Sequence, residues 1–266
     1  MSTAVKWSDR DPLSTHRIDV EDAGGVRLIA FDRPEVRNAF DAAMYEAVTQ
    51  ALAGALEDEA LRAVVLTGKG RAFSSGQDLR EMATLATGGG GPDAGSGFQD
   101  LLDTVVSFDK PLLAAVHGVG VGLGLTLLAH VDLVLVEEGT RLRAPFAELG
   151  VPPEAASSLL LPERMGWQRA AAALLASEWI DADEAVESGL ALRVCAHGTV
   201  LARTMEIASR IASFAPHATR EIKRLMMAAR RPDIVAARAR EESAFAALFA
   251  DPGTNPGSEL TAGLEH

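Results

Sequence analysis

The stretch KPLLAAVHGVGVGLGL, from Lys110 to Leu125, decides the fold. Within it, Leu112 to Val116 is a short, continuous apolar run, which is typical of a strand in a sheet covered on both faces. Alternating glycines follow, and Gly122 to Ala129 then predicts a buried helix. Glycines between a strand and a helix let the backbone approach a ligand closely, at a helix N-terminus where N–H groups lack internal partners. The stretch therefore predicts α/β structure and a candidate site for negative charge.

The same alternation of strand and helix extends to both sides of this stretch. Val26 to Phe31 predicts a strand, and Ala39 to Leu56 has the periodicity of a helix. Ala63 to Thr67 and Asp132 to Val136 are further short apolar runs that predict strands. Together these segments indicate successive ββα-like units, and hence an α/β architecture.

The C-terminal part of the chain has a different pattern. Val200 to Phe214, Ala218 to Ala229 and Asp233 to Phe249 each predict an amphipathic helix, with prolines marking the breaks between them. We therefore expect a core over residues 1–195 and a helical region over residues 196–266.

Composition excludes several classes of function. The net charge of −12 disfavours binding to nucleic acid. No apolar run reaches the roughly 20 residues that a membrane-spanning helix needs, and Met1 to Val20 lacks the pattern of a secretory signal. Cys195 is the single cysteine, so an internal disulfide is impossible, and a reducing compartment such as the cytoplasm is expected. No spacing of His, Asp, Glu or Cys suggests a metal site.

A second glycine turn, RAFSSGQDL from Arg71 to Leu79, follows the strand Ala63 to Thr67. The glycine in this turn lets the backbone pass close to a ligand and leaves the N–H of Gln77 available. Either glycine turn alone is more often a device for tight packing than a ligand site. Two such donors together would make an oxyanion hole.

The order and spacing of three motifs resemble the enoyl-CoA hydratase/isomerase (crotonase) superfamily, over about residues 24 to 195. They are Asn38-Ala39-Phe40 after an Arg-Pro turn, the turn Arg71 to Leu79, and Lys110 to Gly118 leading to Gly122 to Thr126. The resemblance implies a spiral of ββα units, a helical C-terminal region that joins subunits in a homotrimer or a dimer of trimers, and a coenzyme A thioester as substrate. It implies no separate cofactor.

In the family pattern, the two oxyanion donors match the backbone N–H groups of Gln77 and Leu123. Many relatives have glycine or alanine where this chain has Leu123. The residues that the resemblance assigns to the binding of coenzyme A and substrate are Arg37, Ala39, Ser75, Gly76, Gln77, Asp78, Leu79, Gly122 and Phe146.

Hydratases of this family use two glutamates, and the matching positions here hold Thr126 and Phe146. Neither side chain exchanges a proton usefully at neutral pH, so the two-carboxylate hydration mechanism lacks its groups. Downstream, the segment Phe146 to Ser158 resembles Δ3,Δ2-enoyl-CoA isomerases of the peroxisomal type, which have a single catalytic carboxylate at the position of Glu154. On sequence alone, Glu154 can equally be an acid that complements a helix dipole after Pro152-Pro153.

Three functions therefore remain open. The first is isomerisation of an enoyl-CoA, with Glu154 as the proton shuttle and an enolate held by two backbone N–H groups. The second is an enoyl-CoA hydratase of fatty-acid degradation that positions water through Glu154 alone. The third is a non-catalytic acyl-CoA-binding protein. Glu148 is expected to be structural, as are His117, bracing its turn, and His130, at the end of an apolar helix.

Overall fold

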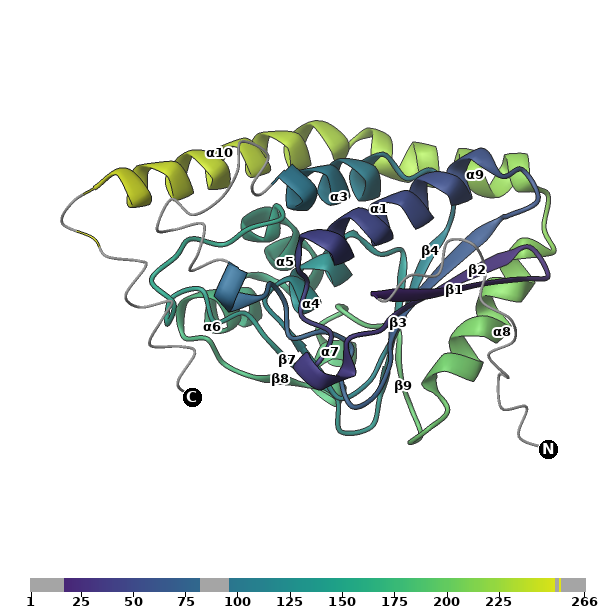
Figure 1. Cartoon of the computed structure of the whole chain (residues 1–266), viewed down its shortest axis with the longest axis horizontal. Coiled ribbons are helices and arrows are strands. Elements are labelled where there is room, and N and C mark those ends of the chain that lie inside the picture. The colour runs from purple at the N-terminus through teal and green to yellow at the C-terminus, as the bar shows by residue number, and fades with distance from the viewer. Residues whose placement is uncertain (1–16, 82–95, 252–253, 255–266) are drawn as a thin grey trace.

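The computed structural model describes residues 17–81, 96–251 and 254. A six-stranded sheet forms its centre, with α1 (Ala42–Glu57), α3 (Ser96–Ser107) and α10 (Arg231–Ala250) side by side over one face (Figure 1). On the other face lies α8 (Val200–Ala212).

The six-stranded sheet is mostly parallel, as its continuous apolar runs predict. Only the first pair, joined through Gly24 and Gly25, is antiparallel. Its strands, in spatial order, are β1 (Ile18–Ala23), β2 (Val26–Phe31), β3 (Ala63–Gly68), β4 (Leu112–Val116), β6 (Leu133–Glu137) and β9 (Arg193–Cys195).

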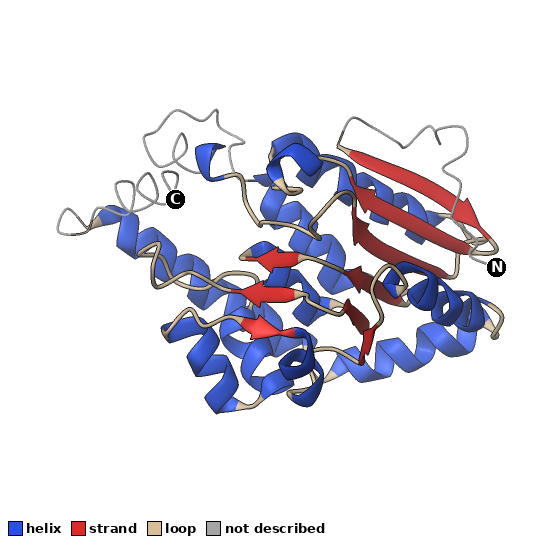
Figure 2. Ribbon diagram, turned by 90° about the horizontal axis from the view of Figure 1, so that it is seen from below, coloured by secondary structure: helices blue, strands red, loops and turns tan. Residues whose placement is uncertain are grey.

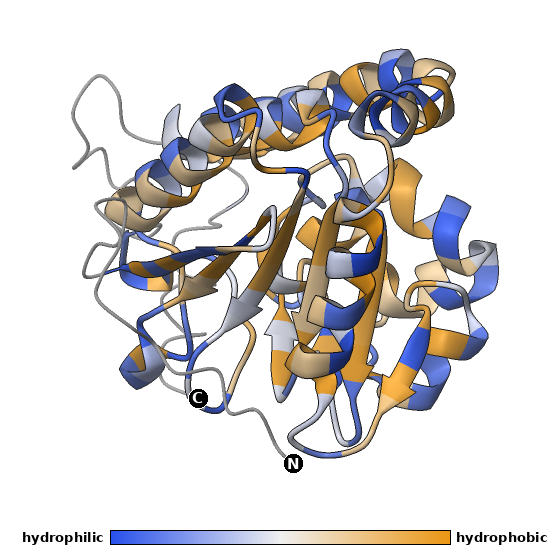
Figure 3. Cartoon of the chain, turned by 90° about the vertical axis from the view of Figure 1, so that its right-hand side faces the viewer, coloured by the Kyte–Doolittle hydropathy of each residue, from blue (hydrophilic) through white to orange (hydrophobic). Residues whose placement is uncertain are grey.

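Both faces of this sheet are buried because side chains alternate along each strand. In β3, Val64 and Leu66 belong to the main core under α1 and α3, whereas Ala63 and Val65 pack toward α8 in a second cluster. Figure 3 shows the apolar residues concentrated on these strands. Burial on both faces explains why the strands read as short apolar runs without alternation.

A second, three-stranded sheet is separate from the first (Figure 2). It contains β5 (Val119–Val121), β7 (Arg141–Arg143) and β8 (Ile180–Asp181). The sequence prediction missed this sheet, because β5 lies inside the glycine-rich stretch that we read as a turn. Its three strands have at most three residues each, too few for a periodic signal.

The remaining helices connect and cover these sheets. They are α4 (Leu123–Thr126), α5 (Ser157–Met165), α6 (Trp167–Leu175), α7 (Ala182–Glu187) and α9 (Pro216–Ala228), with 3₁₀ turns at Pro34–Val36 and Leu127–His130.

Two predicted helices differ from those observed. The helix expected from Ala39 begins at Ala42, because Asp41 is its N-cap and accepts a hydrogen bond from the Met44 N–H. The helix expected over Gly122 to Ala129 is only the short α4, which continues as a 3₁₀ turn through His130.

The strands end at Cys195, where the sequence analysis divided the chain, but α8 packs directly on the sheet. Within the described ranges, no helix is long and apolar enough to cross a membrane. Most of the segment Met1 to Val20, which lacks the pattern of a secretory signal, lies outside the described residues.

Candidate functional site

The two glycine turns predicted from the sequence lie against each other. Ser74 pairs with Gly120 in a parallel bridge. The Ser74 carbonyl accepts a hydrogen bond of 2.9 Å from the Val121 N–H, and the Phe73 N–H donates to the Val119 carbonyl at 3.1 Å. Segments about 45 residues apart in the sequence are therefore fixed as one backbone unit.

Glycine is required where the turns meet. Gly76 has φ +91°, in the region that favours glycine, and a Cβ there would lie 2.5 Å from the Val121 carbonyl oxygen and 3.3 Å from the Leu123 nitrogen. Gly122 faces it from the other turn with φ +53°. A side chain on Gly76 would push the two turns apart.

This contact leaves the N–H groups of Gln77 and Leu123 without an acceptor in the part of the chain that the structure describes. Three N–H groups beside them are engaged: Gly76 donates to Ser74 Oγ, Asp78 to the Phe40 carbonyl and Gly122 to the Arg143 carbonyl. Leu123 is the first residue of α4, so its N–H has no acceptor within the helix. Two unused donors on adjoining turns can hold an oxyanion.

The turn at Arg37 to Ala39 is attached to the first glycine turn by the buried Asn38. The Asn38 amide donates to the carbonyls of Lys69 and Ala72 at 2.9 and 2.7 Å. The Ser75 N–H donates to the Arg37 carbonyl. The structure thus brings together the segments that the resemblance assigned to coenzyme A binding. Arg37 is exposed, whereas the Ala39 side chain is buried.

Asp78 and Leu79 end this turn. The Asp78 carboxylate accepts from Arg33 Nη2 at 3.2 Å, and Arg33 also donates to the Ala39 carbonyl. Within the described residues, the contacts of Asp78 therefore hold the turn together. Leu79 begins a helical segment and is only partly exposed.

Glu154 lies beside the first glycine turn, in the loop between β7 and α5. Its Oε2 accepts a hydrogen bond of 3.0 Å from Gln77 Nε2. The side chain is only partly exposed. Burial, followed by the charge of Glu241, raises the pKa of Glu154 to about 8. A carboxyl group with that pKa, next to two unused N–H donors, is suited to accept and return a proton near neutral pH.

The loop that carries Glu154 has an unusual backbone. Ala155 and Ala156 both have left-handed conformations, with φ +58° and +55°, which non-glycine residues rarely adopt. The neighbouring structure compensates for this conformation. His130 Nε2 donates to the Ala155 carbonyl at 2.7 Å, and the Glu241 carboxylate accepts from the N–H groups of Ala156 and Ser158 at 2.7 and 2.9 Å.

These two supports have distinct electrostatics. Burial lowers the pKa of His130 to about 4, so its imidazole is neutral at pH 7 and donates one N–H. Glu241 comes from α10 and takes the part of an N-cap for α5, which has no side-chain cap of its own at Ala156. Burial also raises the pKa of Glu241.

The two positions that match the hydratase glutamates are both buried and carry no carboxylate. Thr126 is fully buried in α4, and its hydroxyl has no hydrogen-bond partner among the described residues. Phe146 is also buried. Glu148 is exposed and pairs with Arg143, in keeping with the structural assignment made from the sequence. His117 braces its turn through the Gly70 carbonyl, as expected.

Sequence reasoning missed three side chains of this site. It gave Gln77 a backbone donor role and a place among the coenzyme A-binding residues but no side-chain contact with Glu154, interpreted His130 as structural without connecting it to Glu154, and gave Glu241 no role. The Gln77 and Glu154 side chains are 77 positions apart, and Glu241 follows Ala156 by 85. No local pattern signals such contacts.

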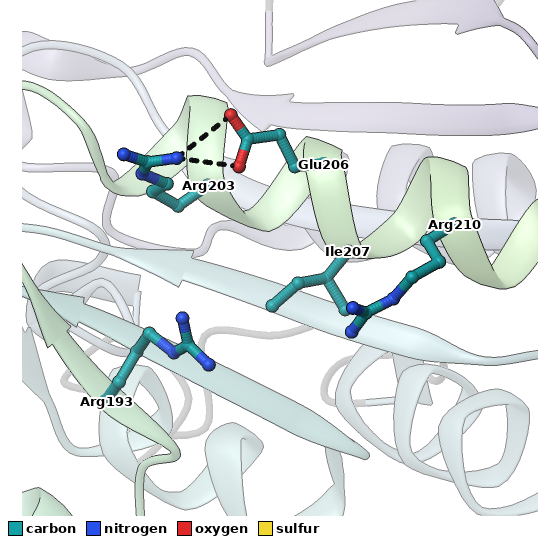
Figure 4. A pocket seen from close by; sticks show the side chains of 5 residues that line it. All are labelled: Arg193, Arg203, Glu206, Ile207 and Arg210. Atoms are coloured by element: carbon teal, nitrogen blue, oxygen red, sulfur yellow. Dashed lines mark hydrogen bonds and ion pairs between the residues drawn. The ribbon is translucent and has the colours of Figure 1, made fainter.

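A pocket elsewhere in the molecule contains none of these residues. It opens between β9 and α8, and Figure 4 shows Arg203 paired with Glu206 at its edge. Its lining residues are Arg193, Arg203, Glu206, Ile207 and Arg210. The described residues contain no group of three or more His, Cys, Asp or Glu side chains that could hold a metal ion.

The fold and the paired glycine turns define a crotonase-type protein. A solved enoyl-CoA hydratase/isomerase from Pseudoalteromonas atlantica superimposes with a TM-score of 0.84 and 32% identity, covering 94% of this chain and 96% of that one. The family profile described as enoyl-CoA hydratase/isomerase matches residues 21–259. The chain therefore belongs to the enoyl-CoA hydratase/isomerase family.

Its curated relatives carry different names within this family. Enoyl-CoA delta isomerase 2 of Rattus norvegicus is 35% identical over 210 residues, which cover 78% of this chain and 53% of the relative. A probable enoyl-CoA hydratase of Rhodobacter capsulatus is 38% identical over 182 residues, covering 67% of this chain and 68% of the relative. This chain thus spans about half the length of the rat isomerase.

Proposed function

We propose that this chain is an acyl-CoA enzyme that stabilises a thioester enolate and isomerises a 3-enoyl-CoA to a 2-enoyl-CoA. The observation that carries the proposal is the proximity of one carboxylate to two unused backbone donors. Glu154 lies 3.0 Å from the side chain of Gln77, and within the described residues the backbone N–H of Gln77, like that of Leu123 on the adjoining turn, has no acceptor. The name of the rat relative, a delta isomerase, supports this choice.

In the proposed reaction, the Glu154 carboxylate takes a proton from C2 of the 3-enoyl thioester. The C–H electrons move into the carbonyl, and the negative charge on the thioester oxygen is held by the N–H groups of Gln77 and Leu123. The protonated Glu154 then gives its proton to C4 as the electrons return, leaving the double bond between C2 and C3. Atoms and charge balance within the substrate and one carboxyl group, so the step needs no cofactor.

The raised pKa of Glu154 suits both halves of this cycle. A carboxylate of ordinary pKa is a weak base toward a carbon acid, whereas one near 8 binds the proton well enough to remove it and still releases it. The base must be ionised in the free enzyme. We therefore expect kcat/KM to rise with pH up to about 8, following the pKa of Glu154.

The test compares Glu154→Gln with the wild type, each offered 3-enoyl-CoA for isomerisation and 2-enoyl-CoA for hydration. We expect the variant to lose isomerisation by about 10²- to 10⁴-fold, the usual contribution of a general acid–base group. Glu148→Gln is a matched control, because it removes an exposed carboxylate that pairs with Arg143 in the same segment. Isomerisation that survives in Glu154→Gln would refute the proposal.

Hydration is the alternative that this assay also measures. The name of the Rhodobacter relative favours it, whereas Thr126 and Phe146 leave this chain without the two carboxylates of a hydratase. Hydration faster than isomerisation, and dependent on Glu154, would replace our proposal. Binding of acyl-CoA without either reaction would indicate a non-catalytic protein.

We further propose that the chain forms a homotrimer or a dimer of trimers through its C-terminal helices. Support comes from large apolar side chains that are exposed on α9 in the single chain, namely Ile222, Leu225 and Met226. Light scattering on the purified protein tests this, and a monomer at micromolar concentration would contradict it.

A further inference from the structure

Tyr45 is the chain's single tyrosine, and it is buried one turn into α1 with 6% of its surface exposed. Its ring packs against Phe40 at 5.2 Å and against Phe98 at 6.0 Å between ring centroids. The hydroxyl is buried as well, and the Gln77 side chain lies close to it, yet it makes no hydrogen bond of good geometry within the part of the chain that the structure describes. A buried hydroxyl without a partner costs free energy, so its position calls for a functional explanation.

The backbone connects Tyr45 to the candidate site. Phe40, on which its ring packs, pairs with Gln77 in a parallel bridge, and the Phe40 N–H donates to the Gly76 carbonyl at 2.7 Å. Tyr45 therefore lies on the side of the first glycine turn that faces α1. The Gln77 side chain extends from that turn to Glu154.

The electrostatics of the hydroxyl agree with this position. Burial is the largest cause that raises the pKa of Tyr45 well above its ordinary value, and the negative charge of Glu154 is the next. The Gln77 side chain, as a hydrogen-bonding neighbour of the hydroxyl, lowers the pKa of Tyr45, while the carboxylates of Glu81 and Asp41, near the start of α1, raise it further. The hydroxyl thus remains a protonated donor throughout the physiological range.

Glu154, for its part, has room for a second donor. Among the described residues, Gln77 Nε2 is the only group that donates to its carboxylate, although an ionised carboxylate can accept several hydrogen bonds. Within the described ranges, the charged group that acts on Glu154 is the carboxylate of Glu241 from α10, and no cation offsets it. His130 is neutral and donates to the Ala155 carbonyl. The charged form of Glu154 is therefore stabilised by one hydrogen bond and destabilised by a neighbouring negative charge.

We propose that Tyr45 is a positioning residue whose hydroxyl donates to the Glu154 carboxylate when that carboxylate ionises, next to the N–H of Gln77. This inference rests on the proposed function, in which Glu154 is the base. In this arrangement the Tyr45 hydroxyl supplies the second hydrogen-bond donor that the ionised Glu154 carboxylate lacks. Tyr45 stabilises Glu154 when Glu154 is ionised and not when it is protonated, and it does so without touching the substrate.

The first test is Tyr45→Phe, which keeps the ring packing against Phe40 and Phe98. Loss of the donor should raise the pKa of Glu154, so we expect the acidic limb of the kcat/KM–pH profile to move upward by about half a unit to one unit. Thr49→Val is the control, because it removes another buried hydroxyl without a described partner one turn further along α1. An unmoved limb, or a rise in KM with an unmoved limb, would overturn the proposal.

The second test needs no turnover. A protein labelled with carbon-13 at the tyrosine Cζ gives a single resonance here, because the chain has a single tyrosine. That resonance therefore belongs to Tyr45 and needs no further variants for its assignment. We expect its shift to change with pH around the pKa of Glu154, near 8, in the wild type and to be constant in Glu154→Gln.

The two proposals can then fail separately. A resonance that follows Glu154 in a protein without isomerase activity would retain the positioning role and refute the proposed function. A resonance that does not change with pH would refute the positioning role, whatever the activity.

Discussion

The two halves of the candidate site are built in different ways. The paired glycine turns offer backbone N–H groups, fixed by backbone contacts such as Val121 N–H to the Ser74 carbonyl. Opposite them, Glu154 offers a side chain on a loop of strained backbone, which depends on His130 and on Glu241. The first half depends on glycines in its own sequence, whereas the second depends on residues far away in the chain.

This difference means that the two halves respond differently to substitution. A backbone donor is insensitive to its own side chain, which is why Leu123 can stand where many relatives have glycine or alanine. It is sensitive to any atom that separates the turns. A side-chain base is sensitive to its own identity and to each group that sets its pKa or its loop. Four substitutions test this distinction.

Apart from the loss of turnover in Glu154→Gln, the largest effect is expected from Gly76→Ala. A Cβ at this position would lie 2.5 Å from the Val121 carbonyl oxygen, so the turns must separate and the Gln77 N–H must move. Loss of one oxyanion donor typically lowers kcat by about 10²- to 10³-fold.

Gly139→Ala is the matched control for this substitution. Gly139 also has a positive φ, +79°, but a Cβ there meets nothing within 4 Å. It should lose stability and keep its activity. Equal losses of kcat in the two variants would show that backbone strain, and not the separation of the turns, is responsible.

His130 should make stability fall in acid. Its folded pKa of about 4 is below its ordinary value of 6.5, so its contribution is complete above pH 6.5 and is lost as pH falls toward 4. The full loss amounts to about 3 kcal/mol in the free energy of unfolding. His130→Gln offers a neutral N–H donor for the Ala155 carbonyl, and urea unfolding at several pH values should show a flatter acid profile. An equal dependence of the free energy of unfolding on pH in the variant and the wild type would contradict this account.

Glu154 should affect stability in the opposite pH range. Its folded pKa of about 8 is above the ordinary 4.5, so its contribution is present below pH 4.5 and is lost as pH rises through 8. We expect Glu154→Gln to be more stable than the wild type at pH 9 by about 2 kcal/mol, less than the full linkage because the side chain is partly exposed. Thermal unfolding across this pH range checks it, with Glu148→Gln as the control.

The same contrast explains how much the sequence predicted. The strands β2, β3, β4 and β6 were predicted to within a residue, because burial on both faces leaves apolar runs. The glycine turns were found for a similar reason, since the spacing of glycines is itself the requirement for close backbone contact. The strands of the smaller sheet, β5, β7 and β8, were not predicted, because two or three residues carry no periodicity. The six-residue edge strand β1 was not predicted either.

The second half of the site was found only through a family resemblance. Glu154 on its own is an acid near a helix start, and nothing in its neighbourhood predicts that Ala155 and Ala156 are left-handed. Their conformation is held by contacts over long sequence separations, which exist only once α10 has packed on α5. The Gln77 side chain was overlooked because its backbone already had a role.

The last and smallest effect concerns Glu241, whose carboxylate supports the loop and also repels Glu154. Removing its charge with Glu241→Gln should lower the pKa of Glu154, because that charge is one cause of the rise to about 8. We expect the acidic limb of kcat/KM to move downward by about one pH unit, worth roughly 1.4 kcal/mol. This is opposite to the shift expected for Tyr45→Phe.

Glu242→Gln is the natural control for this substitution, since it alters the adjacent carboxylate, which lies 3.9 Å from Arg238. A limb that moves in Glu241→Gln and stays in Glu242→Gln would show that the loop support tunes the base through its charge. An acidic limb that moves equally in both variants would indicate that the negative charge of the whole chain, and not Glu241 in particular, raises the pKa of Glu154. The two halves of the site would then differ in how they are built but not in how their electrostatics are set.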